Sequence, residues 1–160
     1  MSRSLRISSL LLFLLATLAL GACGGSGSDD VDKKNAYVRE LNAAQSDFRT
    51  RADDISKQPI PTDGSGKVRL VQRLGGAIDT VIKAMRGIEV PGGVRAEHQQ
   101  LIDTMKGFRA EVQKLTQTFR GGDTRTKRRA ALAAFKAAEL QVGSRVDATI
   151  AAINSKLAAS

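Results

Sequence analysis

The sequence contains few of the residues from which catalytic and metal sites are usually built. Among its 160 residues there are one cysteine, one histidine, one tyrosine and no tryptophan. One cysteine excludes an intramolecular disulfide, and one histidine excludes the paired Glu-x-x-His motifs of di-iron helical bundles. No Ser/His/Asp set, Cys/His set or phosphate-binding Gly-x-x-x-x-Gly-Lys loop can be assembled. We therefore predict a protein that is not an enzyme and has no cofactor.

The composition is that of one packed domain with a basic surface. Hydrophobic residues make up 42% of the chain and charged residues 26%, with only three prolines, which argues against a disordered chain. The formal net charge is +9, and Arg3 and Arg6 account for two of these charges, so the chain beyond residue 22 still carries +7. That part of the chain has the size of a single ordinary domain.

The N-terminal residues have the organisation of an export signal. Two arginines lie within residues 1–6, and residues 7–20 form an apolar run interrupted only by Ser8, Ser9 and Thr17. A helix needs about 20 apolar residues to span about 30 Å of hydrocarbon, and this run is shorter. We therefore predict that residues 1–22 are a cleaved signal peptide and not a permanent membrane anchor.

The apolar run ends with Leu20-Gly21-Ala22-Cys23, an aliphatic residue followed by two small residues and the cysteine. This segment resembles the lipobox of bacterial lipoproteins. The resemblance implies diacylglycerol on Cys23, cleavage before it, further acylation with a fatty acid such as palmitate, and residence at the outer face of the cytoplasmic membrane. The alternative is a simple cleavable signal with an incidental cysteine. Residues 23–31, rich in glycine and serine, predict a flexible tether.

Beyond the tether, apolar residues recur at helical spacing in four segments. These cover about residues 32–58, 67–89, 94–120 and 124–158, and the third stripe ends at Phe119. Prolines and glycines separate them, and no window shows the period-two alternation of a strand. Short connections place consecutive helices side by side. Residues 32–160 therefore predict an all-α, antiparallel up-down-up-down four-helix bundle.

One layer of the predicted core brings three aromatic rings to the level of two glycines. Counted from the loops, Phe48, Phe108 and Phe135 lie at the level of Gly75 and Gly76. A glycine inside a helix costs about 1 kcal/mol relative to alanine, so the pair needs a reason. We predict that the rings pack against the glycines; the alternative is a kink or hinge.

His98 occupies a core position of the third predicted helix. Its level lies near Met85 and Tyr37, and we predict a structural histidine hydrogen-bonded to Tyr37 or to a backbone carbonyl. The alternative is a small-ligand carrier or a haem or metal carrier, with an inter-helix pocket near His98. No further metal ligands occur at suitable spacing. Glu139, beside the stripe of the fourth helix, is predicted to lean out to solvent.

Cations cluster at the turn between the third and fourth predicted helices. This basic tip consists of Arg120, Arg125, Lys127, Arg128 and Arg129, and Lys57, Lys67 and Arg69 flank the other loop at the same end. Cations in the first turn of a helix oppose its dipole by about 0.3–1 kcal/mol each, so this placement does not help helix formation. A solvated basic surface is the simpler explanation, and an anion-binding tip is the functional one. No exposed aromatic residue is expected there for base stacking, which disfavours nucleic acid.

The lipobox, the Gly/Ser tether and the helices rich in alanine and arginine are similar to those of small helical lipoproteins of high-GC Gram-positive bacteria. This resemblance implies a protein held at the membrane through the lipid on Cys23. We expect it to bind or scaffold an acidic envelope polymer or protein through the basic tip, which points away from the membrane.

Overall fold

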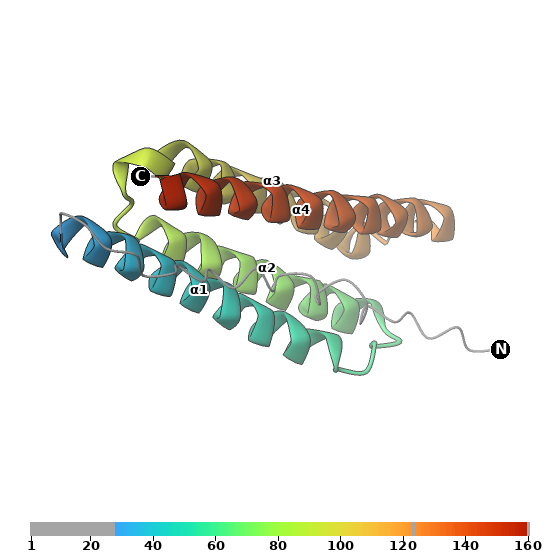
Figure 1. Cartoon of the computed structure of the whole chain (residues 1–160). Coiled ribbons are helices and arrows are strands. Elements are labelled where there is room, and N and C mark those ends of the chain that lie inside the picture. The colour runs from blue at the N-terminus through green and yellow to red at the C-terminus, as the bar shows by residue number, and fades with distance from the viewer. Residues whose placement is uncertain (1–27, 123, 160) are drawn as a thin grey trace.

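The computed structural model describes residues 28–122 and 124–159, and four long helices make up most of them. They are α1 (Ser28–Ser56), α2 (Gly64–Arg86), α3 (Arg95–Arg120) and α4 (Arg125–Ala159), with a short 3-10 helix, η3 (Gly92–Val94), before α3. Consecutive helices run antiparallel (Figure 1), and the described residues contain no strand. The predicted all-α four-helix bundle is confirmed. The predicted signal peptide, the lipobox and Cys23 lie outside the described residues.

Helix α1 begins earlier than the sequence analysis predicts. The prediction of a flexible tether over residues 23–31 is wrong for residues 28–31, which form the first turn of α1. Asp29 and Asp30 lie in this turn, where carboxylates interact favourably with the positive end of the helix dipole. Asp30 also pairs with Lys34 one turn later, at 2.9 Å. The acids after the Gly/Ser tract therefore start a helix.

Helix α2 also begins earlier than predicted, because Asp63 caps it. The Asp63 side chain accepts a hydrogen bond from the backbone nitrogen of Gly66 at 2.6 Å. This bond satisfies one of the N–H groups that have no partner inside the helix. Gly64 is thereby the first helical residue, and Lys67 lies within α2 close to its N-terminal end.

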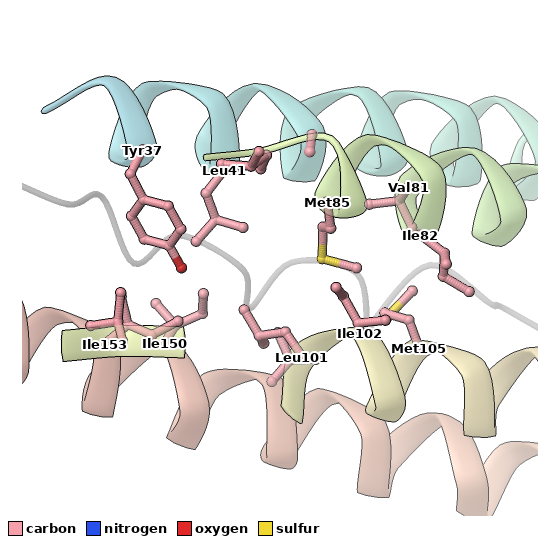
Figure 2. Packing of buried hydrophobic residues seen from close by; sticks show 14 of the residues in the cluster. Tyr37, Leu41, Val81, Ile82, Met85, Leu101, Ile102, Met105, Ile150 and Ile153 are labelled. Carbon is pink, nitrogen blue, oxygen red and sulfur yellow. The ribbon is translucent and has the colours of Figure 1, made fainter. Parts of the chain in front are cut away.

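The core is densest at the end of the bundle where α1 begins and α4 ends. There Tyr37 and Leu41 of α1 face Ile150 and Ile153 of α4 across the space between the helix pairs (Figure 2). None of the four is more than 2% exposed. Complete burial of side chains of this size contributes roughly 1.5–3 kcal/mol each, so this end of the bundle is the main source of stability.

The packing loosens toward the opposite end. Helix α1 packs on α2, α2 on α3 and α3 on α4, whereas α1 and α4 approach each other less closely. The pair α1/α2 and the pair α3/α4 diverge toward the loop between α1 and α2 (Figure 1). In α4 the fully buried residues all lie at or after Val146, and Phe135 and Val142 are only partly buried. The stripe predicted for α4 is therefore buried in its second half and partly exposed in its first.

Gly75 and Gly76 do not receive the phenylalanine rings, and the prediction of ring packing there is wrong. Phe108 and Phe135 stack on each other across α3 and α4, with ring centroids 5.6 Å apart and planes at 21°. A Cβ atom on Gly76 would meet nothing within 4 Å, and one on Gly75 would meet the guanidinium of Arg109 at 3.1 Å. Phe108 and Phe135 therefore pack on each other and not on the glycines, and Phe48 is partly buried against the core.

Glu139 is half-buried on α4, which corrects the prediction that it leans out to solvent. Burial raises the pKa of its carboxyl group, and the nearby Lys136 offsets only part of this effect. The neighbouring Leu140 is 48% exposed. Glu139 lies four residues after Phe135 and three before Val142, so it shares their face of α4 and lies against the protein, whereas Leu140 does not. The loose packing of this half of α4 tolerates the carboxyl group.

Candidate functional site

Two adjoining hollows lie at the divergent end of the bundle, between the α1–α2 loop and the α3–α4 turn. The first hollow has a volume of about 380 Å³, and it is lined by Thr62, Gly64, Lys67, Phe119, Arg125 and Arg128. The second hollow has a volume of about 480 Å³, and it is lined by Gly64, Ser65, Val68, Arg69, Phe119 and Arg120. The two hollows share Gly64 and Phe119, so they form one continuous basic surface.

The cations of the first hollow occupy positions where the helix stripes would place core residues. Lys67 lies four residues before Val71, which begins the apolar stripe of α2. Arg128 lies four residues before Leu132, which begins the stripe of α4, and Arg125 lies three residues before Arg128. Residues at these spacings share one face of a helix. Beyond the last apolar layer, the inward faces of α2 and α4 therefore carry cations, and the bundle ends in a basic hollow.

Phe119 is the wall between the hollows, and the sequence analysis missed this role. Its spacing within the α3 stripe predicts a core residue, yet it is only partly buried and lies outside the main core cluster. Among the residues that line the hollows Phe119 is the aromatic one, and it is partly buried and not exposed. Val68 lines the second hollow together with Phe119, but the first hollow has Lys67, Arg125 and Arg128 around the ring, so the ring is covered only in part. Extending the stripes of α2 and α4 by one turn toward this end would have placed cations at the level of Phe119.

The structure brings together three of the five residues of the predicted basic tip. Arg125 and Arg128 line the first hollow and Arg120 lines the second, whereas Lys127 and Arg129 line neither. Lys67 and Arg69, which were expected only to flank the loop, are walls of the hollows. Lys57 does not join them, because it pairs with Asp53. The hollows are thus a more compact group than the predicted tip.

The cations that line the hollows form no direct ion pair with a carboxylate in the described part of the chain, although the charge of Arg69 acts on Asp63. Lys67 donates from Nζ to the backbone oxygen of Thr62 at 3.0 Å, and Arg69 donates to the hydroxyl of Ser65 at 3.4 Å. Arg120, Arg125 and Arg128 form no ion pair with any described residue. No acid lies in the first turn of α2 or α4, but the carboxylate of Asp63 caps α2 and offsets part of the positive potential at that helix end. This arrangement attracts anions.

His98 is 4% exposed, and both of its ring nitrogens are hydrogen-bonded. Nε2 lies 2.9 Å from the backbone oxygen of Met85, which can only accept, so Nε2 carries the proton. In the neutral ring Nδ1 then accepts from the hydroxyl of Tyr37 at 3.2 Å. The prediction of a structural histidine is confirmed, with both of the expected kinds of partner. This geometry leaves no nitrogen lone pair for a metal or haem iron.

A charged pair beside His98 ties α3 to the end of α4. Glu97 accepts from Nζ of Lys156 at 2.7 Å, and this hydrogen bond lowers the pKa of the Glu97 carboxyl group. Burial, together with the negative charge of Glu97, raises the pKa of the Tyr37 hydroxyl above its ordinary value of 10.0. The hydroxyl therefore remains protonated and able to donate to His98. These contacts hold the structure together at the end opposite to the hollows.

The described helices and side chains contain neither a segment long and apolar enough to cross a bilayer nor a group of three or more His, Cys, Asp or Glu residues suited to a metal. No protein-family model matches the chain, and no curated protein or solved structure is significantly similar to it.

Proposed function

We propose that this chain is a lipid-anchored extracytoplasmic lipoprotein that serves as a non-enzymatic binding or scaffolding module for acidic partners in the cell envelope. The observation that carries the proposal is the pair of adjoining hollows, whose walls hold five cations that form no direct ion pair with a described carboxylate: Lys67, Arg69, Arg120, Arg125 and Arg128. Cations arranged in this way produce a positive potential that attracts polyanions and speeds their association.

The place of the hollows in the fold supports a protein tethered at Cys23. A lipid there would hold the start of α1 close to the membrane. Helix α1 has 29 residues, which corresponds to about 43 Å, and the hollows lie beyond its far end. An anion-binding surface at that distance faces envelope components and not the bilayer that carries the anchor.

The non-enzymatic part of the proposal rests on His98. A general base needs a nitrogen or oxygen within hydrogen-bonding reach of a substrate. Both nitrogens of His98 are already bonded, to Tyr37 and to the backbone of Met85, and the ring is buried. The side chain with the most suitable chemistry for catalysis therefore serves packing.

Lipid attachment is tested by labelling growing cells with radioactive palmitate. We expect the wild-type chain to incorporate label and to sediment with membranes, and the Cys23→Ser variant to do neither, because the thiol that carries the lipid is missing. Labelling or membrane association of the variant that equals the wild type would refute the anchor.

Binding at the basic end is tested with purified cell envelope across a salt series, using the full chain in an uncharged detergent. We expect binding to fall with salt and to be lost when Arg125, Lys127, Arg128 and Arg129 are all changed to Glu. The matched control changes four exposed cations outside the tip to Glu: Arg39, Lys83, Arg86 and Arg95. Equal loss in both variants would show that net charge alone matters and would refute a binding surface at the tip.

A further inference from the structure

We infer that the two hollows form a binding site for a polymer of phosphate groups, with one phosphate in the first hollow and a neighbouring phosphate in the second. The inference rests on the proposed function, because it names the class of anion that the basic end takes up. Its supports are the directions from which the cations approach, the adjacency of the hollows and the open backbone at Gly64.

The cations of the first hollow come from two different helices. Lys67 belongs to α2, and Arg125 and Arg128 belong to α4. A phosphate group presents its oxygens tetrahedrally and accepts hydrogen bonds from several directions, whereas the two coplanar oxygens of a carboxylate are satisfied by one guanidinium. Lys67 uses one of its three N–H donors on Thr62, so two remain for a ligand. Three cations converging from two helices therefore favour phosphate over carboxylate.

The second hollow provides a place for a second phosphate of the same chain. It shares Gly64 and Phe119 with the first hollow and has two cations of its own, Arg69 and Arg120. Both hollows are open to solvent and, at about 380 and 480 Å³, each is larger than a single ion requires. Two linked anions that bind side by side reinforce each other, because the second binds intramolecularly.

Gly64 keeps the boundary between the hollows open. A Cβ atom on Gly64 would meet nothing within 4 Å, so the backbone there is accessible from both hollows. Asp63, the cap of α2, is held by the backbone of Gly66 and the hydroxyl of Ser65. These two hydrogen bonds, together with the charge of Arg69, lower the pKa of the Asp63 carboxyl group, so its carboxylate serves mainly the start of the helix and forms no direct ion pair with a cation of the hollows.

A nucleic acid fits these walls less well than a phosphate polymer without bases. Proteins that bind single strands offer a succession of aromatic side chains on which consecutive bases stack. Here the aromatic residue of the walls is Phe119, and it is partly buried between the hollows. One ring at the boundary can contact the chain that links two phosphates but cannot stack a series of bases.

The sharpest test blocks the hollows without changing a charge. We would measure binding of fluorescent polyphosphate to the full chain in an uncharged detergent, for the wild type, Gly64→Leu and Gly76→Leu. A side chain at Gly64 enters both hollows, whereas Gly76 is an equally open position on α2 that lines neither. We expect Gly64→Leu to weaken binding at least about tenfold and Gly76→Leu to change it less than about twofold. Equal binding by the two variants would overturn the inference.

Competition identifies the anion. We expect poly-L-glutamate of matched charge to compete at least about tenfold more weakly than polyphosphate, and single inorganic phosphate more weakly still. Arg125→Gln with Arg128→Gln should weaken polyphosphate binding and reduce its salt dependence, and Lys136→Gln with Arg145→Gln, two exposed cations of the same helix outside the basic tip, should not. Circular dichroism of each variant checks that the helices are intact.

The outcomes separate this inference from the proposed function. If wild-type protein binds no polyanion at low salt, both fail. If polyglutamate competes as well as polyphosphate, the basic end binds anions in general and only the assignment to phosphate fails. If single-stranded DNA competes better than polyphosphate, the site belongs to nucleic acid and the inference is overturned.

Discussion

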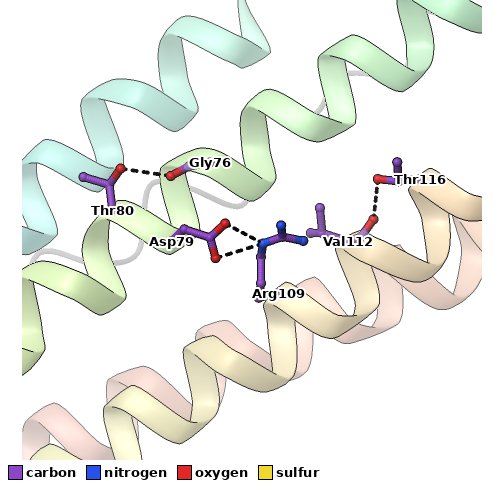
Figure 3. Close-up of polar contacts among 6 residues, drawn as sticks. All are labelled: Gly76, Asp79, Thr80, Arg109, Val112 and Thr116. Atoms are coloured by element: carbon purple, nitrogen blue, oxygen red, sulfur yellow. Dashed lines mark hydrogen bonds and ion pairs between the residues drawn. The ribbon is translucent and has the colours of Figure 1, made fainter.

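The two neighbouring glycines of α2 should respond differently to the same substitution. Gly76 is exposed, its Cβ position meets nothing within 4 Å, and its carbonyl accepts from the hydroxyl of Thr80 in a regular helical turn (Figure 3). Gly76→Ala should therefore stabilise the protein by about 0.5–1 kcal/mol, because alanine restricts the unfolded chain and favours helix without a new contact.

Gly75→Ala should gain the same helix propensity and lose most of it again. The new methyl group would lie 3.1 Å from the guanidinium carbon of Arg109. Nε of Arg109 donates to both carboxylate oxygens of Asp79 at 3.0 Å (Figure 3). Displacing a partly exposed pair of this kind costs about 0.2–1 kcal/mol, so the net change should lie near zero.

Urea unfolding followed by far-ultraviolet circular dichroism measures both effects on the full chain. The control is the Arg109→Ala background, in which Gly75→Ala no longer meets a guanidinium and should stabilise as much as Gly76→Ala does. If Gly76→Ala destabilises the protein by more than about 0.5 kcal/mol, the exposed position given by the structure is wrong and the hinge interpretation of the glycine pair gains support.

Three further predictions concern the buried polar groups and the uneven packing of α4. Tyr37→Phe should destabilise the protein by about 1–3 kcal/mol at neutral pH, because Nδ1 of His98 is left buried without a donor. Because the folded-state pKa of Tyr37 is raised, its contribution is complete below about pH 10 and declines above it, so unfolding measured at increasing pH should show the difference from wild type narrowing. Glu139→Gln should stabilise the protein at neutral pH, because the raised pKa of Glu139 makes its ionisation unfavourable to folding. This gain should disappear as the pH falls below the ordinary carboxyl pKa of 4.5, where the group is protonated in both the folded and the unfolded chain. A gain that grows in acid would contradict the burial of this group. Ile153 is fully buried, so Ile153→Ala should lower the free energy of unfolding in urea by about 2–5 kcal/mol. Leu140 is 48% exposed, so Leu140→Ala should change it by less than about 0.5 kcal/mol. Similar costs for the two variants would show that α4 is packed evenly.

The two ends of the bundle divide stability and binding between them. The end that holds Tyr37, His98 and the pair Glu97–Lys156 is closed by buried side chains and hydrogen bonds. The opposite end, with Arg125 and Arg128 on the inward face of α4, exposes charge where a closed bundle would bury an apolar layer. Cations without partners at a helix start are unfavourable to folding, and the well-packed end offsets that cost.

The periodicity of the sequence was sufficient for the fold class and for the environment of His98. Stripes at helical spacing determine which face of each helix is apolar, and short Gly/Pro connections force antiparallel neighbours. Counting residues from the loops places Tyr37, Met85 and His98 at one level, and these three are hydrogen-bonded partners in the structure. The level of a residue along a straight helix follows from its number alone, because each residue adds a fixed rise.

The depth of burial at each level was decided by the tertiary structure. The spacing of Glu139 from Phe135 and Val142 allows it to face the protein, but how deeply its carboxyl group is buried depends on the side chains of the neighbouring helices. The exposure of Phe119 depends on α2 and α4 together, because Lys67 and Arg128 occupy the layer that would have covered the ring. The sequence of one helix indicates which of its faces is apolar. The separation between neighbouring helices depends on all the side chains at one level, and these come from distant parts of the chain.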